Sequence, residues 1–456
     1  MKKLYLYLPH FLQNIVITIF NVLVYRKRYG GKYRYYYQKF KENQSLSIDE
    51  LKNIQENRLD DFIKYSKSNS KYYNNLILDT NKKFTLKDLK KTPVLNKEGL
   101  RKNISLIHTI SKNNAITSKT GGTTGKSLAV RFTYKNMQER FAMLDSFRDQ
   151  FGYKLGKRTA WFSGKNILSK RDINKNRYWK NDFYCKVRYY STFHINSNSI
   201  EYYINNLINF KPEFIVGFPS NLFEIANYGL KNNIDFPKNY IKAIFPTAET
   251  ITDDSRNVIE RFFKTKMYNQ YASSEGAPFI FECTTGNLHL ELQSGVFEVL
   301  DKNNNPAKKG RLVVTSFTTE GTPLIRYDIG DRVELKEGIC NCGNQNPLIK
   351  KILGRDDDFI YSEETGKINL GNISNTLKDT RGIIKFQVIQ NSLNELIIKL
   401  IIDENDYSVN SQKIFLNNWR DRVGEDIKIK LKFVETINVE KSGKYRMVKN
   451  NIKHLI

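Results

Sequence analysis

A run of glycine, threonine and lysine residues over positions 117–128, TSKTGGTTGKSL, has the composition of a polyphosphate-binding loop. Glycines let backbone amides converge on one anion because no Cβ stands in the way, while threonine hydroxyls and a lysine add donors and positive charge. The candidate phosphate ligands are Thr120, Gly121, Gly122, Thr123, Thr124, Gly125 and Lys126. A Walker A loop would need glycine where Thr120 stands, so a P-loop kinase or ATPase is disfavoured. A surface loop that binds no ligand stays open as the alternative.

Two glutamates follow expected strands farther along the chain. Glu249 comes after the apolar segment 241–245, and Glu275 comes after segment 266–271. We expect both segments to be strands of a largely parallel sheet, in which ligands bind beyond the carboxyl ends of the strands. A carboxylate at that edge, near a triphosphate, is suited to holding Mg²⁺. From the residues alone, an ordinary solvated acidic residue at a strand end remains the alternative for each.

Three cysteines and a histidine are of the residue types that form zinc sites. Five residues separate Cys283 from His289, and one residue separates Cys340 from Cys342. Together they would complete a tetrahedral Cys₃His set, closed to substrate and therefore structural. The spacing differs from the usual C-x₂-C knuckle, so free thiols stay open as the alternative. The fourth cysteine, Cys185, is expected to be packed as an apolar side chain.

Five motifs, in order over residues 80–456, together resemble the adenylate-forming (acyl-AMP) enzymes, in the branch that contains phenylacetate–CoA ligase and its relatives in capsular-polysaccharide loci. The first is the phosphate loop. The others are 271–275, similar to Tyr-Gly-x-Ser/Thr-Glu with Ala272 in place of glycine; 326–331, similar to Tyr-x-Thr-Gly-Asp; 354–358, which matches Gly-Arg-x-Asp-Asp; and 442–444, similar to a Ser-Gly-Lys loop. Their joint occurrence is more specific than any one of them.

The resemblance implies a role for each matching side chain. The implied adenine and ribose ligands are Ala248, Glu249, Tyr271, Asp331 and Arg355, and Ser274 is the implied phosphate ligand. Glu275 would hold Mg²⁺, and Lys444 would lie between the substrate carboxylate and the α-phosphate. Asp357 would be the hinge of the C-terminal domain. Because some members of this branch carry a structural zinc in a similar arrangement, the resemblance favours Zn²⁺ at Cys283, His289, Cys340 and Cys342.

The reaction that the resemblance implies is R-COO⁻ + ATP → R-CO-AMP + PPi, followed by attack of a thiol or an amine on the activated carbonyl. The substrates would be a small carboxylic acid and an acceptor, and the acceptor stays open between coenzyme A and an amino group on a sugar or glycan. The N-terminal stretch FLQN…RKRYGGKY carries the strongest similarity to the polysaccharide-locus relatives. This similarity favours a role in capsule or O-antigen polysaccharide biosynthesis near the membrane.

The expected fold class is α/β, with a large AMP-binding domain of mixed parallel sheets and a β-rich subdomain, plus a small mobile α+β C-terminal domain. We expect an N-terminal helical segment over 1–80, the adenylation domain over 80–355 and the catalytic-lysine domain over 357–456. Ser47 is expected to cap one helix, and Ser220 to cap another through residue 226.

The N-terminal apolar run, residues 4–24, is interrupted by polar residues. Its longest uninterrupted piece, 15–20, is far shorter than the roughly 20 residues that a membrane span requires. We expect an ordinary helix packed on the main domain. A helix lying on anionic lipid stays the alternative, because basic residues follow the apolar run. These are Arg26, Lys27, Arg28 and Lys32.

The composition indicates a folded protein with a strong positive charge. Lys and Arg number 74 against 47 Asp and Glu, for a net charge of +27 over 456 residues. The lysines are spread along the chain beside asparagine and isoleucine, so we do not expect nucleic acid as the partner. A basic nucleic-acid- or membrane-binding protein with a non-catalytic nucleotide site is the alternative function. Four cysteines and no evident cleavable signal peptide favour a cytoplasmic location, on the inner face of the membrane if the N-terminal segment contacts lipid.

Overall fold

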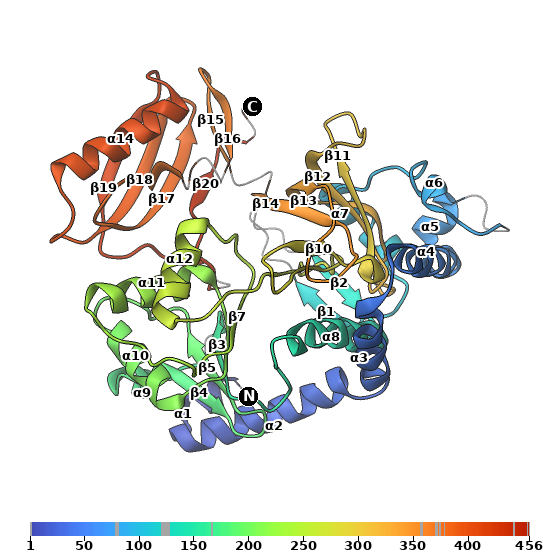
Figure 1. Cartoon of the computed structure of the whole chain (residues 1–456), viewed down its shortest axis with the longest axis horizontal. Coiled ribbons are helices and arrows are strands. Elements are labelled where there is room, and N and C mark those ends of the chain that lie inside the picture. The colour runs from blue at the N-terminus through green and yellow to red at the C-terminus, as the bar shows by residue number, and fades with distance from the viewer. Residues whose placement is uncertain are drawn as a thin grey trace.

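Figure 1 shows the computed structural model of the chain. It describes residues 2–77, 82–119, 128–165, 167–355, 359–369, 373, 375–377, 379–440, 443–453 and 455. Two sheets face each other across the centre of the molecule, a parallel one and a β-rich one. A C-terminal unit lies above the parallel sheet in this view, and the long helix α2 runs below it.

The N-terminal region is helical. Its elements are α1 (Lys2–Tyr7), α2 (His10–Tyr29), α3 (Tyr33–Glu42), η1 (Asn43–Ser45), α4 (Ile48–Asn69), α5 (Lys71–Leu76), α6 (Leu86–Leu89) and α7 (Lys97–Ile107). As expected from the sequence, Ser47 caps α4, and its reciprocal bonds with Glu50 form a complete capping box. Among the described residues, no helix is long and apolar enough to cross a bilayer.

The first sheet has five strands in the order β4-β5-β3-β6-β7, all parallel except β4. Its strands are β3 (Thr159–Ser163), β4 (Trp179–Asp182), β5 (Val187–Ser191), β6 (Phe214–Gly217) and β7 (Ala243–Pro246). The accompanying helices are α9 (Lys170–Asn174), α10 (Ile200–Phe210), α11 (Pro219–Lys231) and α12 (Asp253–Phe263). Strands β6 and β7 are buried along their whole length because helices cover this part of the sheet.

The second sheet has seven strands in the order β11-β12-β13-β14-β10-β9-β8, and every pair is antiparallel. Its strands are β8 (Gln270–Tyr271), β9 (Ile280–Glu282), β10 (Leu288–Leu290), β11 (Gly295–Leu300), β12 (Lys309–Ser316), β13 (Leu324–Lys336) and β14 (Leu348–Arg355), with η2 (Leu292–Ser294) before β11. A separate antiparallel hairpin, β1 (Ile116–Lys119) with β2 (Ala129–Phe132), precedes helix α8 (Tyr134–Asp149). The structure thus contains the α/β and β-rich parts that the sequence predicts.

Two local predictions are wrong. Segment 266–271 is not one strand of the parallel sheet: Met267 makes only an isolated bridge to Ile244, and the chain then crosses to the β-rich sheet as β8. Ser220 is not a helix cap either, because α11 already begins at Pro219 with Phe218 as its N-cap. Proline suits the first helical position since its fixed φ is helical and its missing N–H needs no partner there.

The C-terminal region has a four-stranded sheet with the order β19-β18-β17-β20, packed against one long helix. Its elements are β15 (Phe359–Ser362), β16 (Gly366–Asn369), η3 (Asn375–Leu377), β17 (Ile383–Ser392), β18 (Glu395–Ile402), α14 (Val409–Val423), β19 (Lys428–Phe433) and β20 (Val448–Asn450). Phe415 and Trp419 of α14 are fully buried against Phe386 of β17. This region therefore has a hydrophobic core of its own.

Candidate active site

One large cavity, of about 1690 Å³, collects seven of the predicted site residues. Loops that follow the parallel strands, the end of β8 and residues 444–448 of the C-terminal region form parts of its wall. The predicted residues that line it are Ala248, Glu249, Tyr271, Ser274, Glu275, Asp331 and Lys444. The fold therefore brings side chains from opposite ends of the sequence to one space.

Part of the predicted site lies outside the described residues. The phosphate-loop candidates, Thr120 to Lys126, and the hinge candidate Asp357 belong to this part, as does the side chain of Arg355. The described neighbours of the loop are strands β1 and β2, in which Lys119 pairs with Ala129, and Lys119 lines the cavity. The backbone of Arg355 ends β14 as the strand partner of Asp331.

Tyr271 and Asp331 meet at the cavity wall from two strands of the β-rich sheet. The Tyr271 hydroxyl donates a hydrogen bond of 2.5 Å to Oδ2 of Asp331. Asp331 is buried in β13, with 8% of its surface exposed. A hydrogen bond to a charged carboxylate is stronger than one between neutral groups, so Tyr271 fixes the direction in which this carboxylate points.

Glu275 is buried, and its carboxylate already lies beside a positive charge. The ammonium group of Lys97 is 3.3 Å from Oε1 of Glu275. Lys97 is the first residue of α7, which Asn96 caps, and it also lines the cavity. Sequence reasoning missed Lys97, since nothing in the local pattern of α7 indicates that its first residue faces a glutamate so far along the chain.

The backbone after Glu275 is fixed by close packing. Gly276 has φ +99°, and a Cβ at this position would lie 2.6 Å from Cγ2 of Thr319. The buried guanidinium of Arg140 donates to the carbonyls of Gly276 and Ala277, each at 3.0 Å. Burial lowers the pKa of Arg140 to about 10, so it remains charged at neutral pH. The turn that presents Glu275 to the cavity is therefore rigid.

Glu249 connects two regions of the chain. Its carboxylate accepts hydrogen bonds from the backbone N–H of Ser220, at 3.0 Å, from the Ser220 hydroxyl, at 3.1 Å, and from the backbone N–H of Tyr445, at 3.0 Å. Burial raises the pKa of Glu249. The preceding residue, Ala248, has φ +66°, a conformation rare for a residue with a side chain. Ser220, expected as a cap, is thus a partner of Glu249.

Lys444 follows a glycine that fits only because it lacks a side chain. Gly443 has φ +77°, and a Cβ there would lie 2.5 Å from Oγ1 of Thr192 and 2.6 Å from Cα of Gly164. Thr192 and Gly164 directly follow β5 and β3. The turn before Lys444 therefore lies against the carboxyl ends of the parallel strands.

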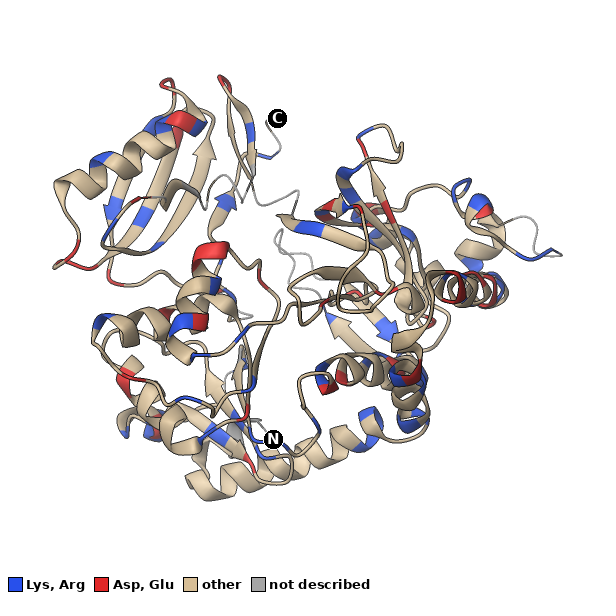
Figure 2. Ribbon diagram, viewed as in Figure 1, with Lys and Arg blue, Asp and Glu red and all other residues tan. Residues whose placement is uncertain are grey.

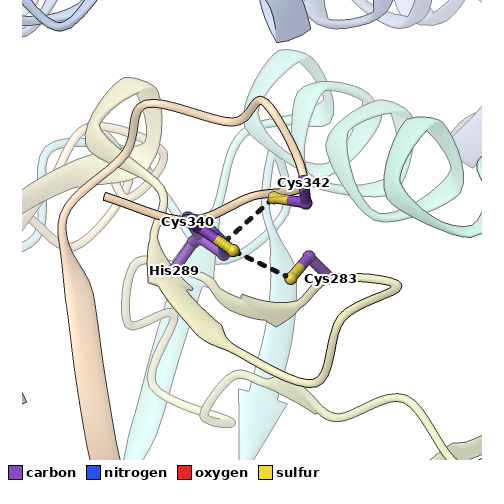
Figure 3. Close-up of side chains that lie close together, drawn as sticks. All are labelled: Cys283, His289, Cys340 and Cys342. Carbon is purple, nitrogen blue, oxygen red and sulfur yellow. Dashed lines mark hydrogen bonds between the residues drawn. The ribbon is translucent and has the colours of Figure 1, made fainter. Parts of the chain in front are cut away.

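The four predicted zinc ligands form one cluster, shown in Figure 3. The ligand atoms of Cys283, His289, Cys340 and Cys342 all lie within 4.8 Å of one another. Sγ of Cys283 is 3.7 Å from Sγ of Cys340, and Nε2 of His289 is 3.5 Å from Sγ of Cys342. Nδ1 of His289 is 3.1 Å from the carbonyl of Asn346, so this nitrogen carries the proton and leaves Nε2 as the ligand atom.

The electrostatics of this cluster suit a thiolate. Burial alone would raise the pKa of the Cys340 thiol, but hydrogen bonds to its sulfur, the first from the Thr285 hydroxyl, outweigh this effect and hold the pKa below its usual range. The cluster lies between the β9–β10 hairpin and the segment that joins β13 to β14. A soft, closed set of sulfur and nitrogen atoms is of the kind that holds zinc.

The comparison with known sequences is decisive for the family. Residues 360–451 match the family described as CapK C-terminal domain. The chain is 34% identical to Protein CapK of Staphylococcus aureus over 458 residues. This alignment covers 99% of this chain and 100% of the relative. The chain belongs to the CapK family. This CapK-family chain is also 29% identical over 160 residues to phenylacetate-coenzyme A ligase of Thermus thermophilus, a match that covers 33% of this chain and 36% of the relative.

Solved structures that share this fold include a CoA ligase and an acyl acid amido synthetase. A 2-hydroxyisobutyryl-CoA ligase in complex with R3-HIB-AMP has a TM-score of 0.70 at 16% identity, over 91% of this chain and 92% of that one. An acyl acid amido synthetase in complex with 2,4-DB has a TM-score of 0.60 at 12% identity, over 91% and 93%. The sequence relatives confirm the resemblance to the branch that contains phenylacetate–CoA ligase and its capsular-polysaccharide relatives, and the shared fold confirms the α/β fold class predicted from the sequence.

Proposed function

We propose that this CapK-family protein activates a carboxylic acid with ATP as an acyl-adenylate and then transfers the acyl group to an acceptor. The observation that carries the proposal is that Glu275, Asp331 and Lys444 line one cavity although they belong to separate segments of the chain. Adenylation needs a carboxylate for the metal of the nucleotide, a carboxylate for the ribose and a cation beside the reacting groups. These three residues supply them.

In the first step, a carboxylate oxygen of the acid attacks the α-phosphorus, and the bond to pyrophosphate breaks. Two anions approach each other, so the ammonium group of Lys444 would lower the barrier by offsetting their charge. Asp331 would accept hydrogen bonds from both ribose hydroxyls, and the bond from Tyr271 would hold its carboxylate in place. Ala248, Glu249 and Arg355 would complete the nucleotide contacts.

Glu275 would hold Mg²⁺. The fit rests on the observation that its buried carboxylate already pairs with a cation, Lys97, at the cavity wall. When bound, Mg²⁺ would supply positive charge to the pyrophosphate leaving group. Ser274 and the loop residues from Thr120 to Lys126 would bind the phosphates beside it.

For the second step, we propose that the region 357–456 rotates about Asp357 relative to 80–355 and withdraws Lys444, which admits the acceptor. The bond from Tyr445 to Glu249 and the close contact of Gly443 with Thr192 support a docking position that such a movement would release.

The acceptor would be coenzyme A or an amino group of a glycan precursor. The CoA ligase of the same fold supports the former, and the amido synthetase supports the latter. The name of the CapK relative supports a role in capsule or O-antigen polysaccharide biosynthesis. We propose a cytoplasmic location because ATP is the energy source and the Cys/His cluster needs reduced thiols.

We also propose that the Cys/His cluster holds one structural Zn²⁺. Cys283, His289, Cys340 and Cys342 would fill all four positions of a tetrahedral site, which leaves none for substrate. Zinc would then join the β9–β10 hairpin to the segment between β13 and β14.

The test of the proposed function is ATP–pyrophosphate exchange with the purified chain and a panel of aryl, fatty, hydroxy and amino acids. Exchange that depends on one class of acid is expected, and it would identify the substrate class at the same time. Adding coenzyme A or an amino sugar to the active acid then distinguishes a thioester from an amide product. Acid-independent release of ADP and phosphate, or salt-sensitive polyanion binding without any exchange, would contradict adenylation.

A further inference from the structure

Helix α2 packs against the parallel sheet with polar side chains. Asn14 accepts a hydrogen bond from the backbone N–H of Asn181, at 3.1 Å, and the Thr18 hydroxyl accepts one from the N–H of Phe183, at 3.1 Å. The Asn21 amide donates to Asp182, at 2.8 Å. These α2 residues are four and three positions apart, so they occupy one face of the helix. The face that contacts β4 is therefore polar.

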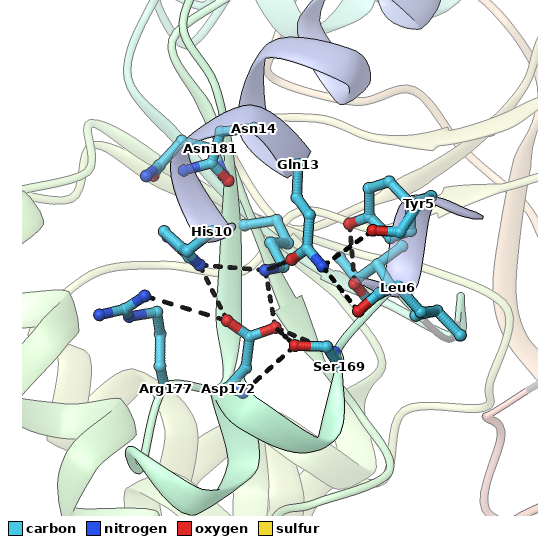
Figure 4. A network of polar contacts seen from close by, with 11 residues as sticks. Tyr5, Leu6, His10, Gln13, Asn14, Ser169, Asp172, Arg177 and Asn181 are labelled. Atoms are coloured by element: carbon cyan, nitrogen blue, oxygen red, sulfur yellow. Dashed lines mark hydrogen bonds and ion pairs between the residues drawn. The ribbon is translucent and has the colours of Figure 1, made fainter. Parts of the chain in front are cut away.

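A buried charged network fixes the start of the same helix (Figure 4). The ammonium group of Lys180 is fully buried and lies 2.7 Å from Oδ2 of Asp172 and 3.0 Å from Nδ1 of His10, and it also donates to the side-chain carbonyl of Gln13. Oδ1 of Asp172 is 2.9 Å from His10. Breaking a buried ion pair is costly, so these contacts hold α2 in one orientation.

The opposite face of α2 is apolar and exposed. Leu12, Val16, Ile19 and Leu23 are 42%, 41%, 56% and 56% exposed. Their spacing of four, three and four residues places them in one stripe, on the side of the helix away from Asn14 and Thr18. Most surface helices turn their apolar face inward; α2 does the reverse, and a contiguous exposed apolar stripe of this kind marks an interaction surface.

The charge around this stripe indicates its partner. Residues 1–41 contain no Asp or Glu and nine basic residues, namely Lys2, Lys3, Arg26, Lys27, Arg28, Lys32, Arg34, Lys39 and Lys41. Figure 2 shows the basic positions of α2 gathered at the end that adjoins α3. A second copy of the chain would bring like charges together along the paired helices, which disfavours self-association. An anionic surface with an apolar interior complements both features.

We propose that α2 lies in the surface of an anionic phospholipid bilayer. Leu12, Val16, Ile19 and Leu23 enter the acyl region, while the exposed basic residues at the end of the helix, Arg26 and Lys27, contact the lipid phosphates. The polar contacts with β4 keep the rest of the chain attached to the docked helix without rearrangement. Because Phe20 of α2 is 58% exposed and also lines the large cavity, docking brings that end of the cavity to the bilayer. This surface is independent of the adenylation chemistry.

The experiment is sedimentation of the full chain with vesicles of phosphatidylcholine alone and of phosphatidylcholine with phosphatidylglycerol. We expect binding to the anionic vesicles and a partition coefficient lower on the order of a hundredfold for the double variant Ile19→Ser/Leu23→Ser. The matched control is Leu106→Ser/Val409→Ser, which removes two exposed aliphatic side chains from other helices. It should bind as the unchanged chain does.

Three results would overturn the proposal: no binding of the unchanged chain to anionic vesicles, equal loss in both double variants, or full binding of the Ile19→Ser/Leu23→Ser variant. A dimer that this variant dissociates, without vesicle binding, would instead assign the stripe to a second copy of the chain. All four substituted residues are exposed, so both variants should fold, and a thermal melt checks this. ATP–pyrophosphate exchange in detergent-free solution should be unaffected by either variant, which separates this test from that of the proposed function.

Discussion

The two groups of functional side chains in this molecule are assembled in different ways. Glu275, Asp331 and Lys444 line a cavity of about 1690 Å³ and come, in that order, from the turn after β8, from strand β13 of the β-rich sheet and from the C-terminal region. The Cys/His cluster comes from neighbouring hairpins of one sheet, and the pocket beside Cys283 and His289 measures only about 30 Å³. The first group is open to a large ligand, whereas the second is closed around its own atoms.

This difference suggests a division of tasks. A reacting site must admit substrates and release products, so its groups can lie on parts of the chain that separate. A structural metal site gains from the opposite arrangement, because ligands held close together in one sheet need little reorganisation. Substitutions in the cavity should therefore change chemistry more than stability, and substitutions in the cluster should do the reverse.

The largest effect is expected from Lys444→Ala. Loss of the cation that offsets two approaching anions should lower the rate of ATP–pyrophosphate exchange roughly 1000-fold. The melting temperature should hardly change, since the backbone turn at Gly443 is retained. Lys432→Ala, at an exposed position of β19, is the matched control and should exchange normally. Near-normal exchange by the Lys444→Ala enzyme would remove this residue from the reaction.

Glu275→Gln should have the next largest effect. The amide binds a cation poorly, so exchange should fall roughly 100-fold and need more Mg²⁺. Lys97→Met provides the comparison, because it removes the cation beside Glu275 and keeps the carboxylate. Measuring exchange against Mg²⁺ concentration for both variants checks the assignment. An unchanged Mg²⁺ requirement in the Glu275→Gln enzyme would mean that the metal is held elsewhere.

For the Cys/His cluster we expect a loss of stability. Cys340→Ser should abolish about one equivalent of bound zinc and lower the melting temperature by several degrees, since a metal-ligand set contributes its binding free energy to folding. Exchange activity per folded molecule, measured well below the melting temperature, should stay within a few-fold of normal. Metal analysis and a thermal melt are the measurements. The Cys185→Ala variant serves as control because this buried thiol lies outside the cluster. A metal-free but fully stable unchanged protein would favour free thiols.

The sequence motifs contain residues that the fold brings to one cavity, but they do not predict how the surrounding elements pack. Tyr271, Glu275, Asp331 and Lys444 stand in short motifs, and the fold does bring them to one cavity. Lys97 could not be found in this way, because its partner is set by how α7 packs on the rest of the chain. The same holds for segment 266–271: apolar alternation predicts a strand, but only tertiary packing decides which sheet takes it.

Helix α2 shows a second limit of sequence reasoning. Periodicity predicts that α2 and α10 each have an apolar and a polar face. In α10 the apolar face is the buried one, with Tyr203, Ile204 and Leu207 inside. In α2 the buried residues are Gln13 and Asn14. Both helices are amphipathic, but α2 packs against the polar edge strand β4, so its polar face is the one turned inward.

Tyr271→Phe should have the smallest effect of these substitutions. It tests the contribution of a single hydrogen bond within the cavity. It removes only the hydroxyl that donates to Asp331 and keeps the ring at the cavity wall. A hydrogen bond to a charged group contributes about 1.5–3 kcal/mol, and the ribose hydroxyls could replace part of it, so we expect KM for ATP to rise roughly ten-fold with kcat little changed. Steady-state kinetics with ATP as the varied substrate measures both. If kcat falls instead and KM is unchanged, the hydroxyl acts in the chemical step, and Asp331 needs no help to bind the ribose.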